Sequence, residues 1–143
     1  PRRLKTLYSG GDRGMDVNVL NTGIDYSAVS SSGMKLEIKF GEGKPAEDTT
    51  MNPVELFLAS LGMCVAAMLR KFCNSHNLEC GEIKVKASGD WEPGAPVCAD
   101  IAMEVEVEGE WDERRKEAFY KVAQTCPVHE SILQCGPVDI RIL

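Results

Sequence analysis

The sequence has no long run of basic residues, no Cys-x-x-Cys pair and no internal repeat. Without a long basic run, and with a net charge of −6 and a pI of about 5.0, a nucleic-acid partner is not expected. The usual cysteine spacing of a zinc module is missing as well. Because no repeat or linker divides the 143 residues, we expect one domain over 1–143.

A long hydrophobic segment is also missing. The longest apolar run, 56–69, is interrupted by Ser60 and Gly62. It is shorter than the ~20 residues that span a bilayer, and no signal peptide is recognisable at the start of the sequence as given. We therefore expect a cytoplasmic protein with no membrane partner. Apolar residues on every side of this run predict a helix that is buried all round.

Cysteine, in contrast, is abundant. The chain has six: Cys64, Cys73, Cys80, Cys98, Cys126 and Cys135. In a small secreted protein they would indicate a disulfide framework. A chain long enough to bury a core, with no secretion signal, favours reactive, metal-binding or simply buried thiols.

The order of secondary-structure patterns predicts an α+β fold. Alternating apolar and polar residues indicate strands at 15–20, 23–29 and 34–40, and again at 82–91, 100–109 and 138–143. Helical patterns cover 53–76, 112–125 and 127–133, and 41–50 is expected to be a loop. Runs of strands and helices in this order favour a largely antiparallel sheet.

The helix at 53–76 has clear end signals. Asn52 is a good N-cap, Pro53 suits the first helical position and Glu55 completes a capping box, while Asn77 suits a left-handed cap. The helix would be roughly 37 Å long, against a radius of gyration of about 14–15 Å for a compact chain of this size. One small sheet cannot cover such a helix, so we expect a homodimer.

Two cysteines differ in their surroundings. Cys126 precedes Pro127 as the N-cap of a short helix, where backbone N–H groups and the helix dipole favour a thiolate. His129, one turn later, could reach the same sulfur. Cys64 lies in the middle of the long helix, where burial alone leaves a thiol inert. It needs a cation or a hydrogen-bond donor from elsewhere in the fold.

The segments "NPVELFLASLGMC" and "TCPVHESI" resemble the OsmC/Ohr family of osmotically induced and organic hydroperoxide resistance proteins. The resemblance implies an OsmC-like intertwined homodimer and a thiol peroxidase without a cofactor or metal. Cys64 would attack an organic hydroperoxide and become a sulfenic acid, and Cys126 would close a Cys64–Cys126 disulfide. A dithiol or lipoyl-type reductant would restore both thiols.

The family also has a Glu directly after the Pro, paired with an Arg that activates the attacking thiol. Here the Glu position is Val54, and the neighbouring Glu55 is the nearest carboxylate. Lys39 and Arg13 are the positions that resemble the family's Arg. The resemblance thus implies catalytic or supporting roles for Cys64, Cys126, Lys39, Arg13, Glu55 and His129.

Two alternatives stay open. Val54 in place of the family Glu favours a protein that senses redox state, or binds a small apolar ligand, without turnover. Separately, the Cys-x-x-His spacings at Cys73 and Cys126 could chelate zinc if both segments met in space; the set would be Cys73, His76, Cys80, Cys126, His129 and Cys135. Outside that site, Cys73, Cys80, Cys98 and Cys135 are expected to be ordinary thiols.

Overall fold

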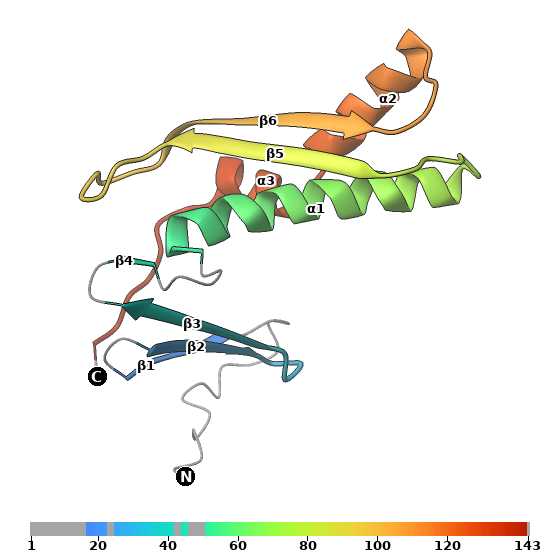
Figure 1. Cartoon of the computed structure of the whole chain (residues 1–143). Coiled ribbons are helices and arrows are strands. Elements are labelled where there is room, and N and C mark those ends of the chain that lie inside the picture. Colours follow the sequence, from blue (N-terminus) through green and yellow to red (C-terminus); the bar gives the residue numbers. More distant parts are fainter. Residues whose placement is uncertain (1–16, 23–24, 42–43, 46–50, 143) are drawn as a thin grey trace. The chain divides into compact units, whose positions relative to one another are not determined.

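A computed structural model describes residues 17–22, 25–41, 44–45 and 51–142. Its contacts divide the chain into two units, Pro1–Met51 and Asn52–Leu143. The first is built from strands and the second from a β-hairpin and three helices (Figure 1). The predicted α+β class with antiparallel pairing is confirmed.

The first unit is an antiparallel sheet of four strands, ordered β1-β2-β3-β4. They are β1 (Val17–Asn21), β2 (Asp25–Ser30), β3 (Lys35–Gly41) and β4 (Lys44–Pro45). Gly33 closes the β2–β3 turn: its φ is +83°, and its N–H donates to the Ser30 carbonyl over 2.9 Å. The three predicted strands are confirmed, but β4 lies where a loop was expected, because it pairs with the end of β3.

One face of β3 differs from the prediction. The alternation at 34–40 predicts a half-buried strand with Met34 and Leu36 on its apolar face, yet these residues are 73% and 45% exposed. The described part of this unit contains no helix that could cover the sheet. Alternation in the sequence marks an apolar face but does not say what covers it.

The second unit begins with α1 (Pro53–Ser75) and the predicted capping box. The Asn52 side chain accepts the Val54 and Glu55 N–H groups, each over 2.9 Å. In return, the Glu55 carboxylate accepts the Asn52 N–H over 2.7 Å. Pro53, which lacks an N–H, occupies the first turn, where none is needed.

A tight chain reversal ends α1. Asn77 has a φ of 51°, the left-handed conformation expected of it. The Leu78 N–H donates to the Cys73 carbonyl over 2.9 Å, and the Asn77 N–H to the Asn74 carbonyl over 3.3 Å. These two bonds form a Schellman motif. The motif turns the chain back toward the last turn of the helix.

A hairpin of β5 (Ile83–Asp90) and β6 (Ala99–Val107) lies along α1 (Figure 1). Val85 pairs with Val105 in an antiparallel register. Burial alternates along β5, as the sequence alternation at 82–91 predicts, with Ile83, Val85 and Ala87 on the less exposed side.

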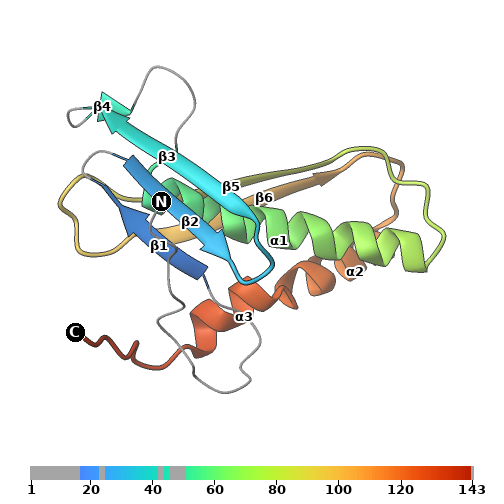
Figure 2. The ribbon, with the colours of Figure 1, turned by 90° about the horizontal axis from the view of Figure 1, so that it is seen from below.

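Two shorter helices complete the unit: α2 (Glu113–Gln124) and α3 (Pro127–Gln134). Both lie beside α1 (Figure 2). The buried core is one stripe of α1 together with one residue of α2 and the N-cap of α3: Leu61, Val65, Leu69, Cys73, Phe119 and Cys126. Cys64 lies about one turn after Leu61 on α1 and is a partly buried residue that packs against this core.

The prediction that α1 is buried all round is wrong for the single chain. Leu61, Val65 and Leu69 are buried, but Met63 is 66% and Phe57 36% exposed. The expectation that the apolar segment is too short to span a bilayer is also wrong. By length and composition alone, the 23 residues of α1 are long and apolar enough to cross a membrane. Core helices of soluble proteins pass the same test, and here one stripe of α1 is buried in the core.

The strand predicted at 138–143 is also wrong. Residues 135–142 have no regular structure, and Val138, Ile140 and Ile142 are 77–92% exposed. Alternation creates a strand only where another strand offers backbone partners. Within the part of the chain that the structure describes, no strand pairs with this segment.

Candidate functional site

The N-terminus of α3 faces the middle of α1. Cys126 is the N-cap, with the predicted extended backbone, and Pro127 occupies the first turn. The Cys126 side chain makes no capping hydrogen bond. The first free N–H group, that of Val128, instead bonds the sulfur of Cys64. This is the donor from elsewhere in the fold that Cys64 needs.

The two sulfurs themselves are in contact. Cys64 and Cys126 are hydrogen-bonded side chain to side chain, although they lie on helices far apart in sequence. Cys126 is completely buried, whereas Cys64 is half-buried. A small oxidant therefore meets Cys64 first, and the sulfur that touches it is shielded from solvent.

Burial raises the pKa of the Cys64 thiol, and the hydrogen bond to Cys126 raises it further. The Val128 N–H lowers this pKa, and the charge of a Cys126 thiolate would raise it. Within residues 52–142, no cation acts on this pKa. The surroundings of Cys64 therefore favour its protonated thiol at neutral pH. One backbone donor, the Val128 N–H, stabilises the thiolate when it forms.

Of the other predicted catalytic residues, Glu55 is not brought to Cys64. Glu55 accepts the N-cap N–H at the start of α1, about nine residues or roughly 13 Å from Cys64 along the helix. Lys39 lies on β3, opposite Asp25, in the first unit. Arg13 lies outside the described residues. Val54, at the family's Glu position, is half-buried in the first turn of α1.

His129 does not reach the Cys126 sulfur as suggested. Its Nδ1 lies 3.1 Å from the Gln124 carbonyl, at the end of α2. The ring therefore links α2 to α3 and fixes the junction that holds Cys126. In residues 51–142 no hydrogen bond joins it to either sulfur of the pair.

The zinc alternative fails on geometry. All six of its candidate ligands are described, yet no three His, Cys, Asp or Glu side chains of the described residues come close enough to hold a metal ion. His76 is occupied at the end of α1, where its Nδ1 lies 2.9 Å from the Phe72 carbonyl.

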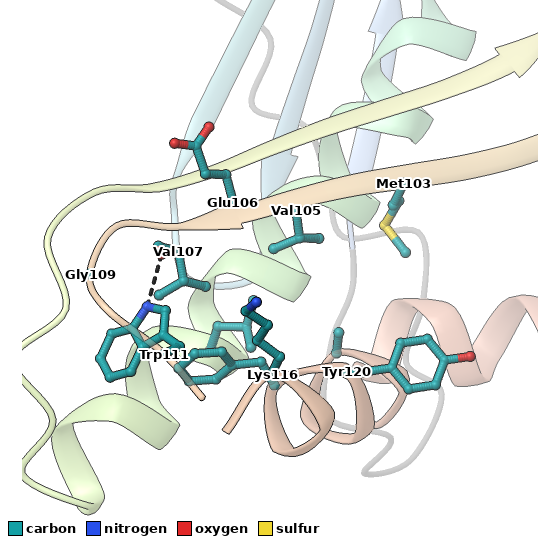
Figure 3. Close-up of a pocket in the computed structure, with 11 residues that line it drawn as sticks. Met103, Val105, Glu106, Val107, Gly109, Trp111, Lys116 and Tyr120 are labelled. Carbon is teal, nitrogen blue, oxygen red and sulfur yellow. Dashed lines mark hydrogen bonds between the residues drawn. The ribbon is translucent and has the colours of Figure 1, made fainter. Parts of the chain in front are cut away.

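A cavity of about 610 Å³ opens between the β-hairpin, α1 and α2. Figure 3 shows Met103, Val105 and Val107 of β6 on one side and Lys116 and Tyr120 of α2 on the other. Trp111 forms one end, held by a 2.9 Å bond from its indole N–H to the Val107 carbonyl. Its walls are mainly apolar, which suits a small apolar molecule.

Sequence reasoning missed two contacts made by the cysteines. One is the Val128 N–H, although a signal was present: Cys126 at the N-cap is a weak capping side chain, which leaves a helix N–H free for another partner. The other is a hydrogen bond from Arg70 to Cys80. Nothing in the spacing of these two residues indicates it, because it depends on the turn after α1.

The family model for OsmC-like proteins matches residues 44–141, more than half of the chain. The chain belongs to the OsmC-like family. Solved structures share its fold. An OsmC-like protein from Mycoplasma pneumoniae is 17% identical, with a TM-score of 0.69 over 87% of this chain and 90% of that one. No curated protein matches the chain.

Two further structures are of organic hydroperoxide resistance proteins. The one from Elizabethkingia anophelis is 26% identical, with a TM-score of 0.54 over 90% of both chains. OhrB of Bacillus subtilis is 20% identical, with a TM-score of 0.53 over 82% of this chain and 89% of that one. The chain thus shares its fold with two organic hydroperoxide resistance proteins.

Proposed function

We propose that this OsmC-like protein reduces organic hydroperoxides with its own thiols. The Cys64 thiolate attacks the terminal peroxide oxygen, the O–O bond breaks, and the leaving alkoxide takes a proton to become an alcohol. Cys64 is then a sulfenic acid. The Cys126 thiol attacks that sulfur, releases water and closes the Cys64–Cys126 disulfide.

The hydrogen bond between Cys64 and Cys126 carries the proposal. It joins a half-buried sulfur that an oxidant can reach to a fully buried one that can attack it from behind. A sulfenic acid on Cys64 would thus meet Cys126 before a second peroxide, and that order protects it from irreversible oxidation.

The proposal includes a homodimer. Met63 and Phe57 on α1, and the apolar residues of the C-terminal segment, are exposed in the single chain. A second copy that covered them would bury the rest of α1. Lys39 or Arg13 of either copy, the positions that resemble the family's Arg, would then supply the cation that Cys64 lacks.

The proposed partners follow from the same chemistry. A small dithiol or lipoyl-type reductant would reopen the disulfide by thiol–disulfide exchange. A cytoplasmic location suits a cycle that starts from free thiols. The net charge of −6 argues against a nucleic-acid partner, and we propose no membrane partner.

Peroxide consumption with a dithiol donor tests the proposal. In a Cys73→Ala/Cys80→Ala background the protein should consume an organic hydroperoxide catalytically. Adding Cys64→Ala should abolish turnover, and adding Cys126→Ala instead should allow one turnover and then accumulate over-oxidised Cys64. Cys98→Ala in the same background is the matched control and should leave turnover unchanged. Undiminished turnover by Cys64→Ala would refute the role given to that residue.

Two observations favour a second candidate, a redox sensor or apolar-ligand protein without turnover. The pKa of Cys64 is raised, and the cavity beside α2 is apolar. This candidate predicts single-turnover oxidation of Cys64 but no steady-state peroxide consumption with any dithiol. A Tyr120→Trp variant, whose indole would line the cavity, would report an apolar ligand by its fluorescence.

A further inference from the structure

A second pair of sulfurs lies at the other end of α1. Cys73 is in its last turn and is completely buried, and Cys80 follows the Schellman turn and is half-buried. The turn bends the chain back so that the two side chains are hydrogen-bonded to each other. The sequence alone marked both as ordinary thiols, because their spacing matches no redox motif.

Arg70 lies on the same side of α1, one turn before Cys73. Its Nη1 donates to the Cys80 sulfur and to the Cys80 carbonyl, each over 3.0 Å, and its Nη2 donates to the Gly81 carbonyl over 2.6 Å. No carboxylate of the described residues forms an ion pair with Arg70. The guanidinium charge is therefore directed at one sulfur and two carbonyl oxygens.

The two sulfur pairs of the unit share a layout. Each has one half-buried sulfur, Cys64 or Cys80, in contact with one completely buried sulfur, Cys126 or Cys73. They differ in their donor: Cys64 has a backbone N–H, whereas Cys80 has a guanidinium. A thiolate is the nucleophilic form of cysteine, and an adjacent Arg holds it by a charge-assisted hydrogen bond.

We propose that Cys80 and Cys73 form a second peroxide-reactive pair, in which Cys80 attacks the oxidant beside Arg70 and Cys73 closes a disulfide. The Cys80 thiolate attacks a hydroperoxide oxygen, the alkoxide or hydroxide leaves and takes a proton, and Cys80 becomes a sulfenic acid. The Cys73 thiol then attacks it, and the Cys73 proton leaves with the displaced hydroxide as water. The hydroperoxide is reduced and the two thiols are oxidised.

The division of roles follows from burial. Cys73 is sealed in the core, and burial, followed by the hydrogen bond to Cys80, raises its pKa to about 11. Cys73 thus keeps its proton at neutral pH and is not the sulfur that reacts first. Cys80 is the one that solvent reaches.

This pair works independently of the first. Cys64 and Cys73 are nine residues apart on α1, roughly 13 Å along the axis and on opposite sides of the helix. A Cys64–Cys73 disulfide is therefore excluded without unfolding α1. The inference does not rest on the function proposed for Cys64 and can be tested without that residue.

The test uses the full chain with Cys64→Ala and Cys126→Ala, treated with stoichiometric cumene hydroperoxide. We expect a mass lower by two hydrogens, restored by dithiothreitol. Cleavage after Glu79 should leave the Cys73 and Cys80 peptides joined until they are reduced, because Glu79 lies between them. Adding Cys73→Ala should leave Cys80 as a sulfenic acid that dimedone traps.

Oxidation spread evenly over Cys80, Cys98 and Cys135, or no Cys73–Cys80 link, would overturn the proposal. This outcome is distinguishable from failure of the Cys64 proposal, since the first pair is absent from the protein tested. Cys98 and Cys135 are internal controls in the same sample, because no arginine of the described residues donates a hydrogen bond to either sulfur.

The role of Arg70 has its own readout. Arg70→Gln should slow alkylation of Cys80 by iodoacetamide at pH 7 about tenfold, the size of one lost charge-assisted hydrogen bond. Arg70→Lys should recover part of that rate, because the charge is kept and the fork is lost. A purely structural role predicts the reverse, since loosening the turn would expose Cys80. Faster alkylation in Arg70→Gln would refute the assignment.

Discussion

Closing the Cys64–Cys126 disulfide should stabilise the protein strongly. The bond would enclose a loop of roughly 60 residues, for which the loss of unfolded-chain entropy corresponds to about 4 kcal/mol. The sulfurs are already in contact, so the native fold adds little strain to this value. A Cys73–Cys80 bond encloses roughly eight residues, which corresponds to only about 2.5 kcal/mol.

Urea unfolding of a Cys73→Ala/Cys80→Ala variant measures this effect on its own. At a slope of about 2 kcal/mol per M, peroxide oxidation should raise the midpoint by about 2 M, at one fixed protein concentration. Adding Cys64→Ala provides the control, in which the same treatment should leave the midpoint unchanged. An oxidised protein no more stable than the reduced one would mean that α1 or α3 must move to form the bond, and would refute the geometry.

Three further predictions concern single residues. Gly62→Ala should stabilise α1 by about 0.5–1 kcal/mol, because the new Cβ would lie 3.6 Å from Val85, an ordinary contact, in a helix interior; thermal unfolding measures it. Cys126→Ala should lower the pKa of Cys64, since both effects of Cys126 raise it; thiolate absorbance against pH measures this. Stability should fall as pH rises from about 9.0 to about 11, by up to about 3 kcal/mol, because the folded state keeps the Cys73 proton over that range.

Each has a matched control. Gly62→Leu should destabilise, because the larger side chain overpacks β5; destabilisation by Gly62→Ala as well would mean that the hairpin lies closer to α1. Cys135→Ala should leave the Cys64 titration unchanged, and an upward shift in Cys126→Ala would contradict the contact. Cys73→Ala should flatten the alkaline decline, and an unaltered decline would assign it to other groups.

Local signals made much of the second unit predictable. The capping box of Asn52 and Glu55 and the left-handed Asn77 depend on neighbouring residues alone, and the structure has each as expected. The β5 alternation also held, because the hairpin packs on α1 within the same unit. Elements whose partners are close in sequence are specified by that sequence.

Predictions that depend on a partner far away in the sequence were less accurate. The alternation of Val138, Ile140 and Ile142 indicates a strand but does not say which other strand would pair with it, and these residues are exposed. At the site, the pairing of Cys64 with Cys126 came from a family resemblance, and the two are in contact. Arg70 was not identified, because its contact with Cys80 depends on the path of a turn that no motif records.

The donor that α3 offers to Cys64 belongs to the main chain at Val128. Any amino acid other than proline supplies the same group in the same place. A saturation library at this codon should therefore retain peroxide reactivity for nearly every replacement that folds. Only proline, which has no N–H, should lower peroxide reactivity while the protein still folds. A method that compares side chains alone would therefore not detect the N–H group that stabilises the Cys64 thiolate.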